Sequence, residues 1–393
     1  MDGGSSPDPE VPEPEESTTA KDTVHSPEPE TDKELLAAPA IPVAEQTEGH
    51  RPDVSTVDGA VSAGEAEGRD VEELPEDRVR IGSEDMSEGE PDVSRMRGVL
   101  DQYGFAVPAQ YVTRYREQTE LQATRRDAIR AQWKVLLSEV GEKPKDVRKL
   151  LRGAVVSGVT AEYRPVVWPL LCGVPTYQKQ KPGLFQRLIK RAEHEERHAQ
   201  ISLDLDRTFP GHPLLDTQEG MASLERVLTA FALYDPHVGY CQSTNFMVGL
   251  LLIMDVTEEE AFWILVHISR VILPEYFAPP MLGTSIDHEV FKELLNARMP
   301  EVVQLLDKMR LDVAILCAQW FLCLFSNRMP CETVCRIWDY IFCRGPPAMF
   351  QVALAVIKQL EPRLLACEEM GEVMELLRET ELSLFDADTL LET

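Results

Sequence analysis

The sequence predicts an all-α fold, and three observations support this prediction. From residue 96 onward, apolar side chains recur every three or four positions in one segment after another, which is the spacing of an amphipathic helix. Glycine and proline fall between these segments, where helices end. The same stretch contains neither a hairpin signature nor an internal repeat, so a sheet or a solenoid is not expected.

Residues 1–95 differ in composition from the rest of the chain. They contain 27 Asp/Glu against 7 Lys/Arg, a net charge of −20 out of −28 for the whole chain, and 11 of the 28 prolines. They contain no Phe, Trp or Tyr. Such a segment cannot bury enough apolar surface to offset the entropy of ordering it. We therefore predict a disordered acidic tail over residues 1–95, in which Ser26 and Ser87 are candidate phosphorylation sites.

The acidic balance and the cysteine pattern narrow the classes of function. Nucleic-acid binders present basic faces to phosphate, so a net charge of −28 argues against DNA or RNA as a partner. The first 30 residues have no apolar signal segment, and the longest apolar run, Phe246 to Met254, is too short to cross a bilayer. We expect a cytoplasmic protein that is at most peripheral on endomembranes. The eight cysteines are predicted to be reduced core thiols rather than metal ligands.

Residues 96–150 are predicted to form a helical lead-in to the main domain. A charged helix is expected from Tyr111 to Glu142, with Trp133 on its apolar face, and a second helix begins near Val147. The main domain is expected to occupy residues 151–377. Residues 378–393 are expected to form a C-terminal tail.

Within the main domain the pattern predicts helix after helix. The expected segments are Gly158 to Gly173, Phe185 to Gln200, Met221 to Tyr234, Asn245 to Met254, Glu258 to Val271, Val290 to Met309, Ala314 to Phe325, Glu332 to Phe342 and Ala348 to Leu360. Pro300 is expected to break its segment, and the last helix to stop just before Pro362. The alternation I-S-L-D-L-D at 201–206 is typical of a strand, but its place in a helical series favours a helix.

The stretch H-E-E-R-H, residues 194–198, formally matches the zinc-protease pattern H-E-x-x-H. A zinc helix packs around a dry site, whereas this segment is charged on every face. The position where a glycine would turn the chain back toward the metal is Ile201, which does not easily adopt a positive φ. A solvated charged helix is therefore the favoured interpretation.

Three short motifs are more informative together than singly. They are R-P-V-V-W (Arg164, Trp168), I-S-L-D-L-D-R (Asp204, Arg207) and G-Y-C-Q (Tyr240, Gln242). Taken alone, Arg207 is explained by a surface ion pair with Asp204 or Asp206, and Gln242 by a helix-end amide. The chain has neither a P-loop nor a dinucleotide fingerprint, so it is not expected to bind a nucleotide by those devices.

In this order and spacing, the three motifs resemble R-x-x-x-W, I-x-x-D-x-x-R and Y-x-Q of the TBC family, whose members are GTPase-activating proteins for Rab GTPases. The resemblance extends to R-T-F-P-G-H-P, E-E-A-F-W-I-L, I-L-P-E-Y-F and R-I-W-D-Y-I-F, and covers roughly residues 96–377. It implies an all-α TBC domain and a Rab partner that brings its own GTP and magnesium. The chain would need no cofactor or metal and would be a GTPase activator rather than an enzyme with its own turnover.

The resemblance also implies roles for the motif residues. Arg207 would be an arginine finger supplied in trans, and Gln242 a second finger that positions water. Asp204, one turn before Arg207, is placed to orient that side chain. Tyr240 and Trp168 would be packing residues that hold the fingers, and Arg164 would form a structural ion pair.

The sequence departs from the family beside Gln242. Where members often read Y-C-Q-G-M-N, this chain has Ser243 and Thr244. If the glycine serves a positive φ, Ser243 costs about 1 kcal/mol there. If the position only needs a small residue at a helix start, serine fits as a cap, and this second interpretation is favoured. The departure supports an alternative function, a Rab-binding adaptor with weak or no activating ability.

Overall fold

The computed structural model describes residues 98–140, 147–193 and 199–392. Among these residues the regular structure is helical, apart from an isolated antiparallel bridge between Leu100 and Ala106. The predicted all-α fold is confirmed. The acidic tail with Ser26 and Ser87, and the H-E-E-R-H stretch, lie outside the described residues.

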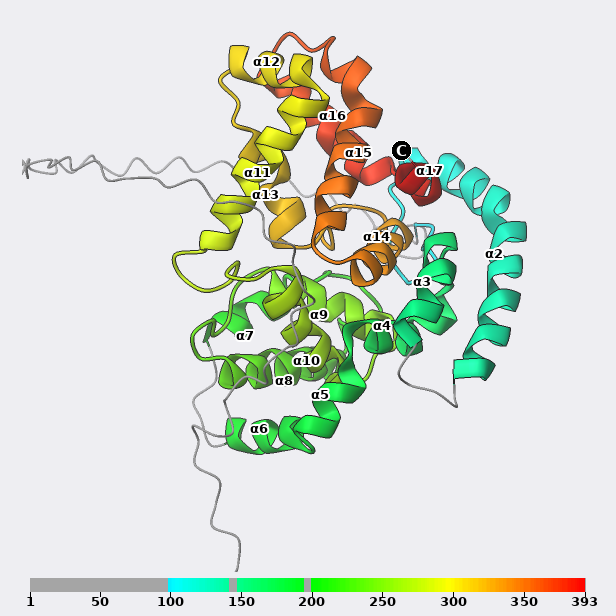
Figure 1. Ribbon diagram of the computed structural model, residues 1–393, viewed down its shortest axis with the longest axis vertical. Helices are drawn as coiled ribbons and strands as arrows, with labels where there is room; N and C mark the ends of the chain where they lie inside the picture. Colours follow the sequence, from blue (N-terminus) through cyan, green and yellow to red (C-terminus); the bar gives the residue numbers. More distant parts are fainter. Residues whose placement is uncertain (1–97, 141–146, 194–198, 393) are drawn as a thin grey trace, which may run out of the picture. The chain divides into compact units, whose positions relative to one another are not determined.

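The helices follow one another closely along the chain (Figure 1). Their bounds are α2 Val112–Val140, α3 Val147–Ser157, α4 Arg164–Cys172, α5 Val174–Gln180, α6 Leu184–Ala192, α7 Ala199–Leu205, α8 Gln218–Tyr234, α9 Thr244–Ile253, α10 Glu258–His267, α11 Leu282–Arg298, α12 Pro300–Lys308, α13 Val313–Leu322, α14 Cys331–Arg344, α15 Pro347–Leu364, α16 Met370–Ser383 and α17 Ala387–Glu392. Two short 3₁₀ turns, Ala109–Tyr111 and Ala161–Tyr163, precede α2 and α4, and a π-helical turn, Ile268–Ile272, continues α10.

Several helices begin where a polar side chain can bind the free backbone N–H groups of the first turn. Thr257 and Glu260 form a reciprocal capping box at α10. Thr217 accepts from the Gly220 amide at the start of α8, and Asp312 accepts from the Ala314 amide at the start of α13. These local signals explain why these three helices begin within three residues of the predicted positions. The helix predicted from Val290 has no side-chain cap, and the prediction is wrong there, because α11 begins at Leu282.

Helix α10 is the centre of the first group of helices. Its residues from Ala261 to His267 are all buried, and it packs against α4, α5, α8 and α9. The Trp263 ring stacks on Tyr177 of α5 with 5.2 Å between centroids, and Phe262 meets Tyr234 of α8 edge to face. A helical segment that is apolar on every side, as Ala261 to Val266 is, is stable only when it is surrounded in this way.

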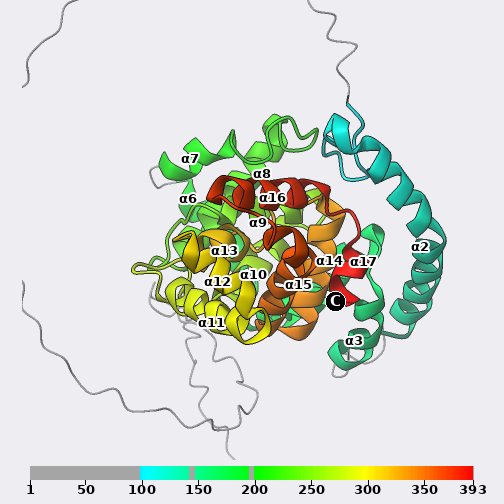
Figure 2. The same cartoon turned by 90° about the horizontal axis from the view of Figure 1, so that it is seen from above.

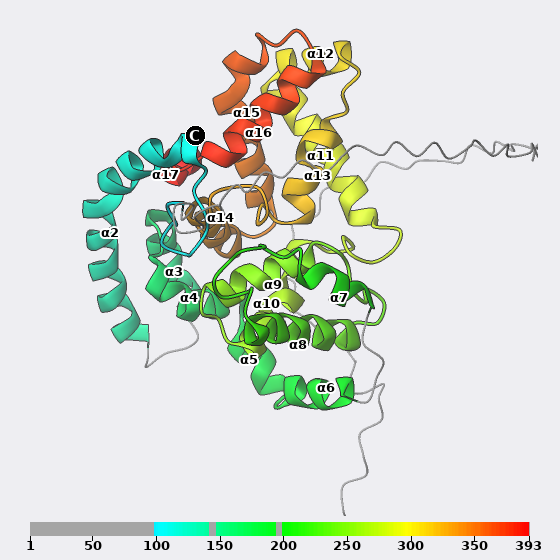
Figure 3. The same ribbon diagram turned by 180° about the vertical axis from the view of Figure 1, so that it is seen from behind.

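Helix α14 organises the second group. It packs against α3, α4, α15 and α17, while α13 packs against α11 and α15 (Figure 3). Buried Trp338 and Phe342 on α14 face Trp168 of α4, so the two groups share an aromatic contact.

The lead-in helix and the C-terminal residues contact each other. Figure 2 shows the end of the chain, in red, between α14 and α2. Arg125 of α2 pairs with Asp388 of α17 at 3.1 Å, and Tyr115 meets Phe385 edge to face. Residues 378–393, expected as a tail, thus include the end of α16 and all of α17, which packs on α14 and α15.

Three local predictions have clear outcomes. The strand-like stretch at 201–206 lies in α7 and the turn after it, and Pro300 separates α11 from α12, as expected. The prediction that a helix stops before Pro362 is wrong, because α15 continues through it to Leu364. Pro362 and Lys358 are both exposed, so the Lys358 carbonyl that loses its intrahelical donor can face water.

No helix among the described residues is long and apolar enough to cross a membrane.

Candidate functional site

Arg207 lies just beyond the end of α7, at the surface. Its side chain is 70 % exposed, and its Nη1 lies 3.8 Å from Oδ1 of Asp204, whose side chain is only 4 % exposed. The Arg207 backbone N–H donates to the Asp204 carbonyl at 3.2 Å, which closes the turn. A buried carboxylate thus lies beside one end of the guanidinium, while most of the arginine side chain stays exposed and can meet a partner.

Tyr240 connects this turn to the segment that contains Gln242. Its hydroxyl donates to the other carboxylate oxygen of Asp204, Oδ2, at 2.8 Å. Burial and the negative charge of Asp204 raise the pKa of Tyr240, so the phenol keeps its proton and remains a donor. Gln242 is exposed two residues further on. Asp204 therefore contacts Arg207 through one oxygen and the Gln242 segment through the other.

Helix α9 approaches the Arg207 turn closely. A Cβ on Gly249 would lie 3.0 Å from Cγ2 of Thr208 and 3.2 Å from the Phe209 ring, so any larger residue would require these side chains to shift. Phe209, with a φ of 50°, packs edge to face against Phe105 of the lead-in and Phe246 of α9. Sequence reasoning missed these supporting residues, although R-T-F-P and the glycine inside an apolar run were visible signals.

The favoured interpretation of Ser243 is wrong. Its φ is 115°, a conformation that side-chain-bearing residues rarely adopt, and its side chain makes no capping hydrogen bond to α9. Its Oγ is buried without a hydrogen-bond partner among the described residues. The turn is closed instead by Thr244 Oγ1, which donates to the Cys241 carbonyl at 2.8 Å. This position therefore requires the positive φ that glycine supplies without strain.

Ser243→Gly is expected to stabilise the protein by about 1 kcal/mol, because it relieves this backbone strain and removes a buried unpaired hydroxyl. The measurement is the shift of the urea unfolding midpoint. Ser138→Gly is the matched control: Ser138 is exposed within α2, where glycine should destabilise by about 0.5 kcal/mol. Destabilisation by both substitutions would contradict the strain at Ser243.

Arg164 and Trp168 lie in the core, where α4 meets α14. Arg164 is fully buried and donates to both oxygens of Asp339, at 3.2 and 3.1 Å, and to both oxygens of Glu332, at 3.0 Å each. Trp168 Nε1 donates to Asp339 Oδ1 at 2.8 Å. The R-x-x-x-W motif thus forms a buried ionic cluster that fixes α4 against α14.

The charges of this cluster depend on one another. Burial disfavours the charge on Arg164, but Asp339 and Glu332 outweigh it and raise the arginine pKa well above its usual value. Burial alone would raise the pKa of the Glu332 carboxyl, but the charge of Arg164 outweighs it, so that pKa is lowered. Tyr103 of the lead-in accepts from Arg164 Nη1 at 2.6 Å and donates to Glu332. The lead-in is therefore tied to the main domain through the cluster.

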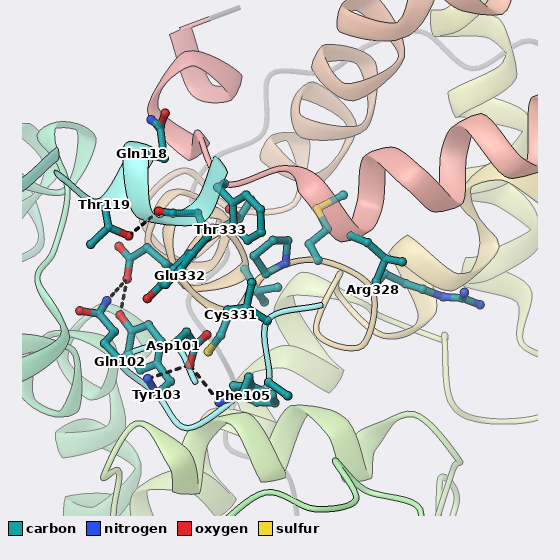
Figure 4. Close-up of a pocket in the computed structure, with 18 of the residues that line it drawn as sticks. Asp101, Gln102, Tyr103, Phe105, Gln118, Thr119, Arg328, Cys331, Glu332 and Thr333 are labelled. Atoms are coloured by element: carbon teal, nitrogen blue, oxygen red, sulfur yellow. Dashed lines mark hydrogen bonds between the residues drawn. The ribbon is translucent and has the colours of Figure 1, made fainter. Parts of the chain in front are cut away.

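A cavity of about 220 Å³ lies beside this cluster (Figure 4). Glu332 and Tyr103 lie at its edge, and Asp101 accepts from the backbone N–H groups of Tyr103 and Phe105, both at 2.9 Å. Phe209, two residues after Arg207, also lines it. Its walls come from the lead-in, α2, the start of α14 and the residues around Phe385, segments that local sequence patterns do not relate.

Metal ligands are not gathered anywhere in the described part of the chain. No group of three or more His, Cys, Asp or Glu is placed to hold a metal ion among the described residues. All eight cysteines are free, and six are buried as predicted for core thiols, whereas Cys241 and Cys367 are only partly buried.

Comparison with known proteins places this geometry in a family. Residues 161–365 match the Rab-GTPase-TBC domain. The chain belongs to the TBC family.

Relatives and solved structures of TBC proteins agree with this assignment. Human growth hormone-regulated TBC protein 1 is 34 % identical over 281 residues, which cover 70 % of this chain and 82 % of that protein. Zebrafish growth hormone-regulated TBC protein 1-A is 32 % identical over 303 residues, which cover 75 % of this chain and 84 % of that protein. The motifs, together with Y-G-F-A-V-P at 103–108, predict this similarity to growth hormone-regulated TBC proteins. The crystal structure of a Chlamydomonas flagellar RabGAP TBC domain has a TM-score of 0.65 at 27 % identity, covering 75 % of this chain and 98 % of that one.

The TBC assignment gives the exposed residues a context. A TBC domain of this type acts on Rab GTPases, so the partner class of this chain is the Rab family. The three family motifs fall on two separate places: two of them meet at Asp204, and the third forms the buried cluster at α14.

Proposed function

We propose that this chain accelerates GTP hydrolysis by a Rab-family GTPase, to which it supplies Arg207 and Gln242 in trans. The observation that supports this most directly is the junction at Asp204. One buried carboxylate contacts the exposed arginine at 3.8 Å and, through Tyr240 at 2.8 Å, the segment that presents the exposed glutamine. Two exposed polar side chains, carried by backbone segments that both contact the same buried carboxylate, suit residues that act on a partner.

The chemistry of the two side chains fits the reaction. GTP hydrolysis spreads negative charge over the γ-phosphoryl oxygens, and a permanently charged guanidinium can donate to two of them at once. The glutamine amide offers both a donor and an acceptor, so it can orient the attacking water against the phosphoryl group. Asp204 lies 3.8 Å from the guanidinium and favours rotamers that keep the two groups close, which reduces the entropy lost when the complex forms.

GTP and magnesium belong to the Rab, and the chain contributes side chains rather than a cofactor. Its contact with membranes is indirect, through the bound Rab, and nucleic acid is not a partner. The chain is then a GTPase activator in the cytoplasm.

The test is a single-turnover assay in which GTP-loaded Rabs are mixed singly with excess full-length protein, and phosphate release is followed. At least one Rab is expected to hydrolyse GTP faster by orders of magnitude. The strained Ser243 beside Gln242 favours a second candidate, a Rab-binding adaptor. Measurable binding to a Rab with no acceleration of any Rab would favour the adaptor and refute the activator.

Gln242→Ala is expected to lower the maximal rate with the responsive Rab by about 10²- to 10³-fold, the usual loss when one preorganised donor is removed from a reacting group. Gln242→Glu should fare no better, because it replaces the donor with a negative charge near the phosphates. Gln180→Ala, an exposed glutamine at the end of α5, is the control and should keep full activity. Full activity of Gln242→Ala would remove this residue from the mechanism.

A further inference from the structure

Asn245, in the first turn of α9, contacts both segments that present the proposed fingers. Only 1 % of its surface is exposed. Its Nδ2 donates to Thr208 Oγ1 at 2.8 Å, and its Oδ1 accepts from the Ser243 backbone N–H at 3.0 Å. Thr208 follows Arg207 in the chain, and Ser243 follows Gln242. A single buried amide therefore connects the residues next to the two fingers.

The hydrogen bonds determine which way this amide points. The Ser243 N–H can only donate, so it must meet the amide oxygen. The amide nitrogen must then face Thr208, whose hydroxyl already donates to the Asp204 carbonyl at 2.7 Å and is left with its lone pairs to accept. Asn245 thus donates to Thr208, and Thr208 donates to Asp204, in one continuous series of hydrogen bonds. If the Asn245 amide were flipped, its NH₂ group would face the Ser243 N–H, and two donors would meet.

The packing leaves this chain little room to shift. Cγ2 of Thr208 lies where a Cβ on Gly249 would be only 3.0 Å away, so α9 lies directly against the Arg207 turn. At its other end, Asn245 Oδ1 accepts a hydrogen bond from the backbone N–H of Ser243, whose φ is 115°. Strained backbone persists only where its surroundings hold it in place, and this hydrogen bond is one such restraint.

We propose that Asn245 is a positioning residue that sets the separation of Arg207 and Gln242 and thereby the rate of the reaction. It acts through Thr208 on the Arg207 turn and through Ser243 on Gln242, and it does not touch the substrate. The inference rests on the proposed function for its effect on rate. Its effect on the two backbone segments does not depend on that function.

The first test is kinetic, in single turnover with the responsive Rab. Asn245→Ala and Thr208→Val are each expected to lower the maximal rate by about 10- to 100-fold, because small misplacements of reacting groups have effects of this size. The concentration for half-maximal rate should stay within about twofold, because the docking surface is intact. The double variant should lose less than the product of the two single losses, because both single variants remove the Asn245–Thr208 bond. Thr208→Ser keeps the hydroxyl and should restore most of the rate.

Two controls separate positioning from a general loss of structure. Asn327→Ala removes an amide far along the sequence whose Oδ1 has no hydrogen-bond partner among the described residues and whose Nδ2 donates to Gln319 at 3.4 Å, and it should leave the rate unchanged. Circular dichroism at the assay temperature gives the folded fraction of each variant. A rate that falls only in proportion to the folded fraction, or a changed half-maximal concentration at an unchanged maximal rate, would overturn the proposal.

The second test does not use GTP hydrolysis. Amide hydrogen exchange in the full chain should become faster in Asn245→Ala over both 205–209 and 239–243, with α10 as the internal reference. Unchanged exchange in either segment would overturn the positioning role, whatever the rates show. If the wild-type protein accelerates no Rab but exchange rises in both segments, the proposed function fails and the structural link remains.

Discussion

Arg207→Ala is expected to remove nearly all acceleration of GTP hydrolysis, a loss of about 10³- to 10⁵-fold in the maximal rate with the responsive Rab. The guanidinium would no longer offset the charge that develops on the γ-phosphoryl oxygens. Arg207→Lys should recover little, because an ammonium group lacks the planar fork that binds two oxygens. The measurement is single-turnover phosphate release at saturating activator.

The chain offers a closely matched control for this substitution. Arg378 on α16 is also exposed and pairs with a carboxylate three residues earlier, Glu375, as Arg207 does with Asp204. Arg378→Ala should leave the rate unchanged. Because the Arg207 side chain is 70 % exposed, Arg207→Ala should also leave the unfolding midpoint close to that of the wild type. Acceleration that survives in Arg207→Ala would refute the assigned mechanism, even if Rab activation itself is real.

Arg164→Met is expected to have the largest effect on stability, a loss of about 3–5 kcal/mol, because it leaves Glu332 without its ion-pair partner and Asp339 with only Arg336, whose Nη1 lies 3.5 Å away. Asp339 is fully buried, and the Glu332 side chain is 26 % exposed, so water cannot fully replace the arginine. Arg164→Lys should lose less, since it keeps a charge but cannot donate to both acids in the same way. Urea unfolding followed by tryptophan fluorescence measures the difference.

The origin of this loss can be separated from simple loss of packing. Adding Glu332→Gln and Asp339→Asn to Arg164→Met removes the unpaired charges and should recover part of the stability. Arg378→Ala again serves as the exposed control and should unfold with the wild type. A triple variant that is less stable than Arg164→Met would show that the buried charges are not the cause.

Local patterns determined the fold class of this protein because helix formation leaves marks within a few residues. The spacing of apolar side chains, and capping residues such as Thr257 and Asp312, act over one or two turns, so they can be recognised without knowing what the helix packs against. The error at Pro362 arose because its cost depends on whether the Lys358 carbonyl meets water, and that is decided by the rest of the fold.

The candidate site was only partly predictable. Resemblance to the TBC motifs indicated Asp204, Arg207, Tyr240 and Gln242, but residues taken singly favoured ordinary ion pairs and helix ends. Ser243 was misread because a serine before a helix is usually a cap, and its φ of 115° is set by the turn that Asn245 and Thr244 close. Neither Thr208 nor Asn245 was suspected, since their hydrogen bond joins residues 37 apart in the chain.

The sequence by itself determined that this chain is helical, that its first 95 residues differ in kind from the remainder, and that it carries the motifs of a TBC domain. Only the tertiary structure decided which of those residues meet. It placed Arg164 against Glu332 and Asp339, which lie 168 and 175 residues further along the sequence. It also brought the Arg207 turn and the Gln242 segment together at Asp204. The reason is physical: periodicity and capping act between neighbours along the chain, whereas burial, charge pairing and strain depend on segments that become neighbours only after folding.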